Sequence, residues 1–449
     1  MAERDAWGER LPRNLGLWSS IAVLVGSTIG SGIFRVPAAI ALQLQSPGPV
    51  LLTWVLGGVL ALFGALTFAE LAASMPRSGG VFAYILEAFG PLPAFLFGWT
   101  ELAVVRASAL GAIATLFAEY LGYFFRLTPQ QIHYIAALAI VLVGLFNYVG
   151  VNYAKVVMNF ITIAKYGALF LLGVLAFSIG DGNAGNFTPL FPTGVNLSLM
   201  ASALIPVMWT YDGWADLSFM GGEVKNPGRT LPLALIIGTS MIVVVYLLLN
   251  LAYMYLVPLP EMAQSPLITT TAAQHIPLLG AEGAAVIAAV VMVSAFGALN
   301  GSMMTGPRIF FAMADRGLFF QTIARVSPRF QSPSVAIWLA TVLGVLYVLL
   351  NDFAQLADRF ILGIWPFYAL AVGAVFVFRR KRPELERPYR TWGYPVVPLL
   401  FLFASVAMVV NALVKDTRNT AVTMGIIIAG IPVYFMWRRF KPMRSESVR

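Results

Sequence analysis

Long apolar segments, separated by short polar ones, run along almost the whole chain. Because about 20 apolar residues in a helix cross the hydrocarbon core of a bilayer, the pattern predicts an all-helical, multi-pass membrane protein. A window of this length predicts about twelve transmembrane spans, at 17–43, 50–73, 82–116, 132–150, 154–180, 199–222, 231–256, 283–314, 334–350, 354–378, 395–414 and 419–437.

The first span is interrupted by a segment rich in glycine and hydroxyl residues, from Gly26 to Phe34. Small residues four apart, such as Gly26 and Gly30, are also typical of close helix packing. The combined density of glycine and hydroxyl groups favours a break in the helix, which a membrane tolerates where the break is buried or lines a wet cavity. The free N–H groups of the second half then suit a carboxylate, and the free carbonyl groups of the first half suit an ammonium ion.

A second polar interruption, Thr210 to Trp214, lies in the sixth span. It contains Asp212, and a carboxylate inside the membrane costs about 2.5–3.5 kcal/mol or more, so we expect it to have a role or a partner. Breaks in the first and sixth spans predict two five-helix repeats of opposite orientation, followed by two added helices. This arrangement is typical of carriers that bind substrate at mid-membrane between the broken helices.

The predicted regions follow from the spans and from the basic residues. They are a cytoplasmic N-terminus at 1–16, the first repeat at 17–180, the inverted second repeat at 199–378, a basic cytoplasmic loop at 379–394, the last two spans at 395–437 and a basic cytoplasmic tail at 438–449. This assignment puts about 22 of the 29 lysines and arginines on one side of the membrane, whereas the opposite loops 181–198 and 257–282 contain none. We therefore expect both termini in the cytoplasm.

The composition agrees with a membrane protein and argues against several chemistries. Hydrophobic residues make up 59% of the chain and charged residues 11%, whereas soluble domains carry about 25% charged residues. The net charge of +9 follows the distribution of basic loops and does not indicate nucleic acid. The chain has no cysteine and two histidines, His133 and His275, in or beside predicted loops. We therefore expect no metal, no cofactor and no enzymatic function.

Lys165 is a charge inside the fifth span. Its ammonium group can stand in for a coupling cation beside carbonyl groups of the broken first helix, or it can carry a proton. The other interpretation is a structural buried pair, for example with Asp212. Glu101 and Arg106 in the third span are five apart, which is not the spacing of a helical i,i+4 pair, and we interpret them as structural. A polar patch, Asn300–Ser302, can face the first span from the eighth.

Further motifs follow these in a characteristic order. They are Gly30-Ser31-Gly32-Ile33-Phe34, Ala69-Glu70-Leu71, Ser78-Gly79-Gly80, Trp99-Thr100-Glu101-Leu102 with Arg106, Tyr211-Asp212-Gly213-Trp214, Glu223-Val224-Lys225-Asn226-Pro227 with Leu231-Pro232, Phe296-Gly297 with Asn300-Gly301-Ser302, Arg308-Ile309-Phe310-Phe311, and Pro383-Glu384-Leu385-Glu386-Arg387-Pro388. Together they resemble the L-type amino-acid transporter (LAT) branch of the amino acid–polyamine–organocation (APC) superfamily, over nearly the whole chain.

The resemblance implies a LeuT-type fold and transport of L-amino acids, often by obligatory exchange. It implies carboxylate contacts at the N–H groups of Ser31 and Gly32 and the Ser31 hydroxyl, and ammonium contacts at carbonyl groups of Thr28, Trp209 and Asp212. Trp209 is implied as the outer gate, Trp365 as a pocket residue and Lys165 as the lysine of the fifth span. The expected substrate-binding set is Thr28, Gly30, Ser31, Gly32, Ile33, Trp209, Tyr211, Asp212 and Gly213, and the expected coupling residues are Lys165 and Ser302.

Two features limit what the resemblance implies. Animal members are tethered to a heavy chain through a cysteine after the third span, and this chain has no cysteine. It therefore resembles bacterial members, which work without a partner. Members with aspartate after the tyrosine of the second break include carriers of cationic and of neutral substrates, so Asp212 leaves the preferred side chain open.

The leading hypothesis is a carrier in the cytoplasmic (inner) membrane that exchanges neutral L-amino acids without sodium and functions alone. A proton-coupled symporter, with Lys165 or Asp212 as the proton carrier, is the nearest alternative. A carrier that prefers cationic amino acids or polyamines is another, and a receptor that binds an amino acid without moving it is a distant one. The sequence shows no ring of pore charges that would support a channel.

Overall fold

A computed structural model of the chain describes residues 11–191, 196–265, 268–415 and 417–440. Residues 1–10 of the predicted N-terminal region and 441–449 of the predicted tail therefore lie outside the described part. The described residues form helices and connecting loops, with two isolated bridges between extended residues and no named strand.

Each predicted span is matched by one helix or by two helical segments that follow one another. They are α1 (Leu17–Thr28) with α2 (Gly32–Leu44), α3 (Pro47–Ser74), α5 (Pro91–Thr100) with α6 (Arg106–Phe125), α7 (Pro129–Val149), α8 (Val151–Ser178), α9 (Leu197–Tyr211) with α10 (Asp216–Phe219), α11 (Pro227–Leu256), α14 (Gly280–Thr305) with α15 (Pro307–Asp315), α16 (Ser334–Leu350), α17 (Phe353–Lys381), α18 (Val396–Lys415) and α19 (Thr417–Phe440).

The apolar lengths of these helices agree with a multi-pass membrane protein. Eight helical segments in the described part are long and apolar enough to cross a bilayer, and the bent pair α1 and α2 makes a ninth. Three shorter apolar helices lie at 162–178, 197–211 and 334–350. The fold class expected from the hydrophobic pattern is confirmed.

The third span begins later than the sequence predicted. Residues 82–89 belong to a separate short helix, α4 (Val81–Phe89). Gly90 then adopts a φ of 88° and Pro91 opens α5. A glycine with positive φ ends a helix, and a proline in the first turn starts one, so these two residues divide the predicted segment. The predicted loop 257–282 likewise contains two short helices, α12 (Leu259–Gln264) and α13 (Ile268–Gln274).

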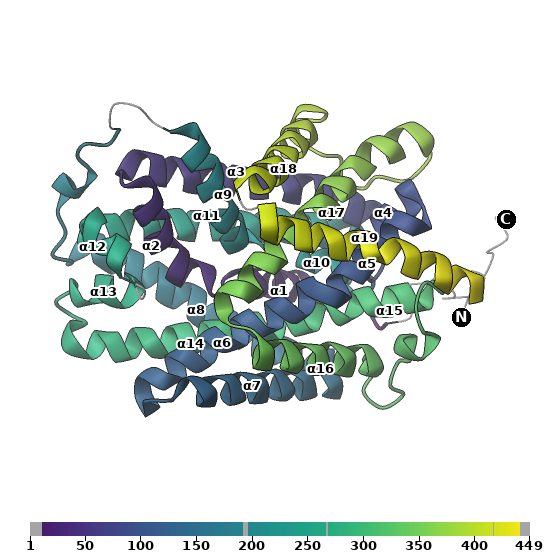
Figure 1. Cartoon of the computed structure of the whole chain (residues 1–449), viewed down its shortest axis with the longest axis horizontal. Coiled ribbons are helices and arrows are strands. Elements are labelled where there is room, and N and C mark those ends of the chain that lie inside the picture. Colours follow the sequence, from purple (N-terminus) through teal and green to yellow (C-terminus); the bar gives the residue numbers. More distant parts are fainter. Residues whose placement is uncertain (1–10, 192–195, 266–267, 416, 441–449) are drawn as a thin grey trace.

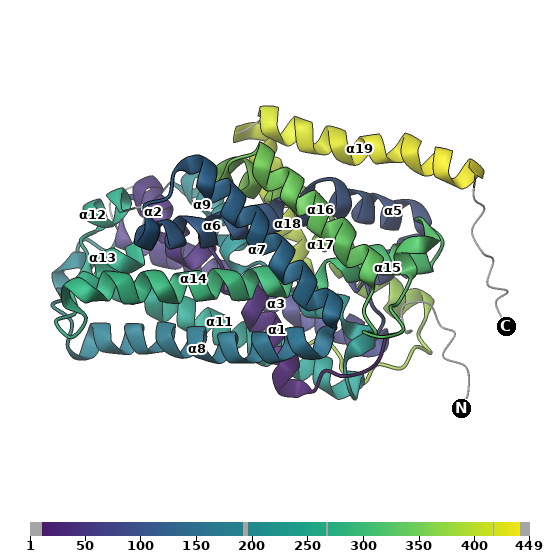
Figure 2. The ribbon, with the colours of Figure 1, turned by 90° about the horizontal axis from the view of Figure 1, so that it is seen from below.

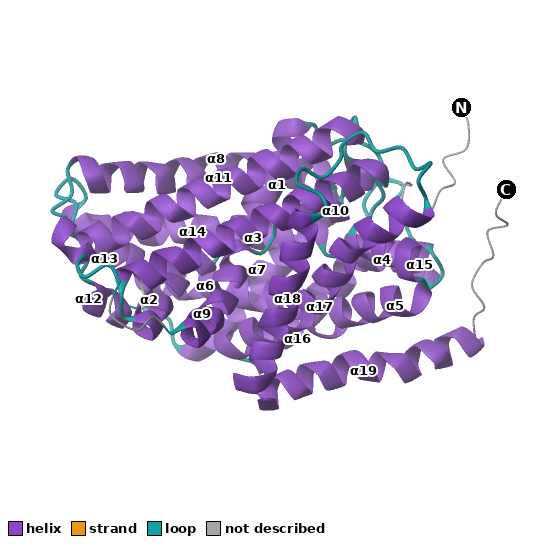
Figure 3. Cartoon of the chain, turned by 90° about the horizontal axis from the view of Figure 1, so that it is seen from above, coloured by secondary structure: helices purple, strands orange, loops and turns teal. Residues whose placement is uncertain are grey.

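Most helices run along the long axis of the molecule, whereas α18 lies across it (Figures 1 and 3). The first half-helix α1 contacts α8, α11 and α14, and α11 packs along α3. Helices α6, α7, α14 and α16 pack on one another. The last two helices lie outside this core: α18 packs on α17 and α3, and α19 runs along one side, against α5 (Figures 2 and 3).

The bundle has two ends, which we name by their segments. The N-terminal face holds the start of α1, the ends of α3 and α17, and α15, and the opposite face holds α12, α13 and the end of α2 (Figure 1).

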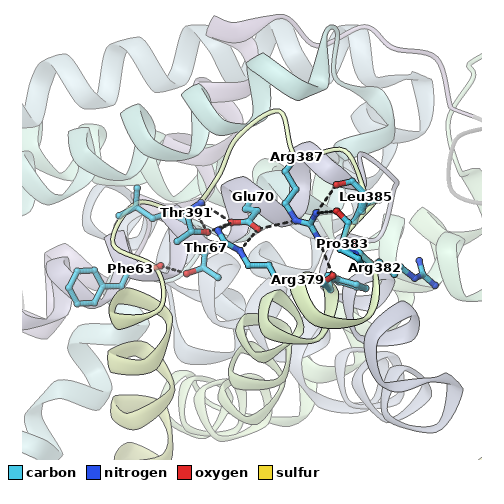
Figure 4. A network of polar contacts seen from close by, with 11 residues as sticks. Phe63, Thr67, Glu70, Arg379, Arg382, Pro383, Leu385, Arg387 and Thr391 are labelled. Carbon is cyan, nitrogen blue, oxygen red and sulfur yellow. Dashed lines mark hydrogen bonds and ion pairs between the residues drawn. The ribbon is translucent and has the colours of Figure 1, made fainter.

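On the N-terminal face, Glu70 at the end of α3 accepts hydrogen bonds from Arg379 (2.9 and 2.6 Å) and from the N–H and hydroxyl groups of Thr391 (2.7 and 2.8 Å) (Figure 4). Arg387 donates to carbonyl groups of its own loop and of α17. This cluster pins the loop 382–395 to α3.

Candidate functional site

The first break separates α1 from α2 at Ile29–Ser31, where the two helix axes differ by 41°. Before the break, the hydroxyl groups of Ser27 and Thr28 donate to the carbonyl groups of Val23 (2.7 Å) and Leu24 (2.9 Å). Such bonds to a carbonyl one turn earlier bend a helix. The unwinding predicted from the local composition is therefore present, and α1 ends with carbonyl groups that need donors.

Side chains from three other helices supply donors to these carbonyl groups. The ammonium group of Lys165 on α8 donates to Gly26 O (2.6 Å) and Ile29 O (2.7 Å). Ser294 on α14 also donates to Ile29 O (3.1 Å), and Tyr246 on α11 donates to Thr28 O (3.0 Å). Lys165 is 1% exposed, so its side chain is held inside the protein, with its ammonium group hydrogen-bonded to the backbone at the end of α1.

The second half of the first span presents its amide groups instead. Ser31 stands at the N-cap position of α2, and no side chain caps this helix start among the described residues. The first N–H groups of a helix have no acceptor within the helix, and the helix dipole adds positive charge there. Ser31 and Gly32 both line a cavity, so the start of α2 offers an anion site at that wall.

The second break begins after Tyr211, where α9 ends, and α10 starts at Asp216. Asp212 is extended, and Gly213 has a φ of 109°, in the region that favours glycine. A Cβ on Gly213 would lie 2.9 Å from Thr28 Cα, in the first break. Reciprocally, a Cβ on Gly32 would lie 2.6 Å from Thr210 Cα. Each break thus carries a glycine that lets the backbone of the other approach closely.

The two breaks border a half-open cavity with about 440 Å³ of empty space, a figure that includes open solvent. Its walls come from both broken spans and from α6, α14 and α17. The lining residues are Ser27, Thr28, Gly30, Ser31, Gly32, Arg106, Ala109, Ile113, Trp209, Asp212, Gly213, Asp216, Ser302 and Phe360. Trp209 and Phe360 meet edge to face, with ring centroids 4.7 Å apart. The lining therefore combines an aromatic pair with three charged residues, Arg106, Asp212 and Asp216.

Arg106 reaches the cavity because the third span contains a π-helical turn, η1 (Glu101–Val105). Its Nε lies 3.3 Å from Glu101 Oε2. The sequence interpretation, that residues five apart are not placed to pair, is therefore wrong here, because a π turn brings i and i+5 onto one face. Arg106 also donates to Ser302 (2.9 Å) and lies 3.9 Å from Asp216, which accepts from Thr305 (2.9 Å).

Asp212 has a separate environment at the same cavity. Its carboxylate accepts a hydrogen bond from the hydroxyl of Tyr368 on α17 (3.0 Å). The alternative pairing with Lys165 that the sequence allowed is not the arrangement found, since the ammonium group of Lys165 contacts carbonyl groups of α1.

Most of the predicted site residues meet at this cavity, and four do not line it. Thr28, Gly30, Ser31, Gly32, Trp209, Asp212, Gly213 and Ser302 line it. Lys165 lies behind the break, and Ile33 is fully buried. Tyr211 points to α3, where its hydroxyl donates to Trp54 O (3.2 Å). Trp365 stacks on Phe401 at 5.8 Å and lines a separate apolar recess, so it does not form a wall of this cavity.

Several cavity and support residues were missed in the sequence. The lining residues missed are Ser27, Arg106, Ala109, Ile113, Asp216 and Phe360, and the supporting ones are Tyr246 and Ser294. A signal existed for Asp216 and Arg106, because each is a charge inside a span. Single hydroxyl groups such as that of Ser294 carry no comparable signal, since they often bond to their own helix.

Comparison with known proteins agrees with this architecture. Residues 15–437 match the family model described as "Amino acid permease". The human b(0,+)-type amino acid transporter 1 is 33% identical over 443 residues, 96% of this chain and 89% of that protein. The serine/threonine exchanger SteT of Bacillus subtilis is 30% identical over 434 residues, 96% of this chain and 98% of that protein. The human cystine/glutamate transporter is 31% identical over 436 residues, which are 95% of this chain and 86% of that protein.

Proposed function

Because the chain belongs to the amino acid permease family, in its L-type branch, we propose that it exchanges neutral L-amino acids without sodium. Amino-acid transport itself follows from the family and from relatives that are named transporters and exchangers rather than enzymes. Beyond this, we propose the mode of transport, the substrate site and the class of side chain that the substrate carries.

The observation that carries the proposal is the pair of breaks packed against each other at one cavity. We assign the substrate carboxylate to the N–H groups of Ser31 and Gly32 and to the Ser31 hydroxyl, because these amides are uncapped at a helix start. We assign the ammonium group to carbonyl groups of Thr28, Trp209 and Asp212. A carbonyl oxygen that already accepts one hydrogen bond has a second lone pair for this contact.

The remaining site residues have supporting roles in this proposal. Gly30 and Gly213 allow the backbone to unwind and approach, and Trp209 with Phe360 closes the cavity on one side. Ile33 and Tyr211 hold the breaks from behind. Ser302 acts through Arg106 rather than by binding a cation.

Lys165 supports the sodium-independent mode. Its ammonium group already supplies a positive charge to two carbonyl groups at the end of α1, where a coupling cation would otherwise bind. Because the ammonium group of Lys165 already occupies this position, a sodium ion is not needed there. A proton-coupled symporter is the alternative, in which Lys165 or Asp212 gains and loses a proton in each cycle.

We further propose that the N-terminal face lies in the cytoplasm and that the chain works alone in the cytoplasmic membrane. The face carries the basic ends of α17 and α19, whose last turns hold Arg379, Arg380 and Lys381, and Arg438 and Arg439. Such residues gather on the cytoplasmic side of membrane proteins. The sequence has no cysteine through which a second chain could be linked by a disulfide.

The test is uptake of labelled serine or alanine into sodium-free proteoliposomes at equal internal and external pH. We expect uptake into vesicles loaded with the same amino acid and at least about tenfold less into empty ones, which is a difference of about 1.4 kcal/mol in barrier. Uptake into empty vesicles that rises with an inward proton gradient would instead establish symport. A strict need for sodium would contradict the role given to Lys165, and binding without uptake in either case would indicate a receptor.

A preference for cationic substrates is the second candidate, and Asp212 is the observation that favours it. This carboxylate lines the cavity and accepts a hydrogen bond from Tyr368, so it can also face a positively charged side chain. If this is its role, arginine or putrescine competes with labelled substrate in wild type and at least about tenfold less in Asp212→Asn, because an ionic hydrogen bond contributes about 1.5–3 kcal/mol. Under the leading proposal, Asp212→Asn changes competition by neutral and cationic amino acids equally.

A further inference from the structure

Glu223 occupies a distinctive position on the N-terminal face. It ends the short 3₁₀ turn Gly221–Glu223 that follows α10. Its carbonyl oxygen accepts the N–H groups of Asn14 (2.8 Å) and Leu15 (2.9 Å), and the N–H of Lys225 donates to Leu15 O (2.8 Å). Leu15 and Val224 form a parallel bridge. The segment that leads into α1 is thereby fastened to the segment that follows α10.

The side chain of Glu223 makes a second, independent connection. Its two carboxylate oxygens accept hydrogen bonds from Nε (2.7 Å) and Nη2 (3.2 Å) of Arg308, on α15. The two side chains are 0% and 1% exposed. A fork-to-fork pair of this kind has a fixed geometry. Removal of one partner from a buried pair is strongly unfavourable, because the other charge is left buried without a partner.

Glu223 connects segments that belong to both broken spans. Helix α1 precedes the first break and α10 follows the second, and both lie nearer the N-terminal face than α2 and α9 do (Figure 1). Glu223 fastens both of them to α15. Helix α15 continues α14, and α14 also contacts α1. The segment after α3 joins the same group, since Gly79 donates to Phe219 O (2.8 Å). The Glu70 cluster of Figure 4 connects different elements, α3 and the loop 382–395.

We propose that Glu223 is a latch that couples the two half-helices, so that the cavity opens toward the N-terminal face only when both of its connections break together. The carbonyl group holds the segment before α1, and the carboxylate holds α15. Opening then releases α1 and α10 as one event. The inference rests on transport by alternating access, and it goes beyond the proposed substrate site because none of these contacts lines the cavity.

The absence of cysteine from the sequence makes a direct test simple. In the double variant Leu15→Cys/Val224→Cys, the two thiols stand on paired backbones about 4.8 Å apart, within the range of about 4.4–6.8 Å between Cα atoms that a disulfide spans. We expect oxidation to lower exchange in proteoliposomes at least about tenfold and reductant to restore it. Binding of labelled amino acid to the oxidised protein should stay within about twofold of the reduced protein.

The controls separate the latch from the proposed function. The single variants Leu15→Cys and Val224→Cys should exchange equally with and without oxidant. Complete cross-linking with unchanged exchange would overturn the latch, and so would loss of binding on oxidation, because the disulfide would then act on the site. Failure of wild type to exchange at all would instead refute the proposed function.

Hydrogen–deuterium exchange on the unaltered protein provides a second test. Peptides that contain Asn14, Leu15 and Lys225 should exchange at least about tenfold faster during turnover than without substrate, while the peptide with Thr391, bonded to Glu70, stays unchanged. Glu223→Gln should accelerate the same peptides without substrate. The matched change Glu87→Gln, in a pair with Arg382 whose side chains are 17% and 42% exposed, should not. Equal protection of the latch peptides at rest and during turnover would contradict the proposal.

Discussion

Lys165→Ala is expected to lower amino-acid exchange at least about 100-fold while the protein still folds. The ammonium group donates to Gly26 O and Ile29 O, and each charged hydrogen bond contributes about 1.5–3 kcal/mol. The loss of two such bonds, at about 1.4 kcal/mol per tenfold change in rate, gives this magnitude. Gly26 O then loses its ammonium donor, and Ile29 O keeps only the hydroxyl of Ser294. Little water can reach this place to replace the ammonium group, so the break loses its fixed shape.

The measurement is the initial rate of exchange in proteoliposomes, with the unfolding temperature and the size-exclusion profile recorded for the same sample. Lys381→Ala, at the exposed end of α17, is the matched control and should behave as wild type. Aggregated or unfolded Lys165→Ala protein would show that the lysine is structural. Folded protein with wild-type exchange would show that the break does not need its charge.

Gly32→Val is expected to weaken substrate binding at least about 100-fold, or about 2.7 kcal/mol. A Cβ at this position would lie 2.6 Å from Thr210 Cα, and backbone atoms cannot move aside as the end of a flexible side chain can. The two breaks must therefore separate, and the uncapped amides of α2 move away from α9.

Equilibrium binding of labelled amino acid to purified protein measures this effect. Gly425→Val is the control, because a Cβ on Gly425 meets nothing within 4 Å. It should fold and bind as wild type does. Wild-type affinity in Gly32→Val would mean that the close approach of the two breaks has no part in the site.

The local features of the site were accessible from the sequence. The glycine and hydroxyl residues of 26–34 act on their own stretch of backbone, and the break appears within that segment. Asp212 and Lys165 stand out because a charge inside an apolar span is rare. The hydrophobic pattern likewise predicted each span, but not the division at Gly90 that delays the third span, because a glycine and a proline inside an apolar run leave the apolar count unchanged.

The connections between distant residues were not accessible in the same way. Glu101 and Arg106 pair through a π turn, and no composition rule predicts where a helix gains one residue per turn. Glu223 and Arg308 are 85 residues apart, and Glu70 and Arg379 are 309 apart. Glu70, Glu223 and Arg308 stand in motifs of the resemblance and Arg379 opens the predicted basic loop, but their pairing depends on how the spans pack. Trp365, placed in the pocket by the resemblance alone, packs on Phe401 instead.

The most direct measurement is an experimental structure of the protein with a neutral L-amino acid bound. The proposal requires the substrate carboxylate within hydrogen-bond distance of the N–H groups of Ser31 and Gly32, and the ammonium group at the carbonyl groups of Thr28, Trp209 or Asp212. It also requires Lys165 Nζ to remain on Gly26 O and Ile29 O. An amino acid bound away from the two breaks, or a sodium ion in the place of the lysine ammonium group, would contradict it.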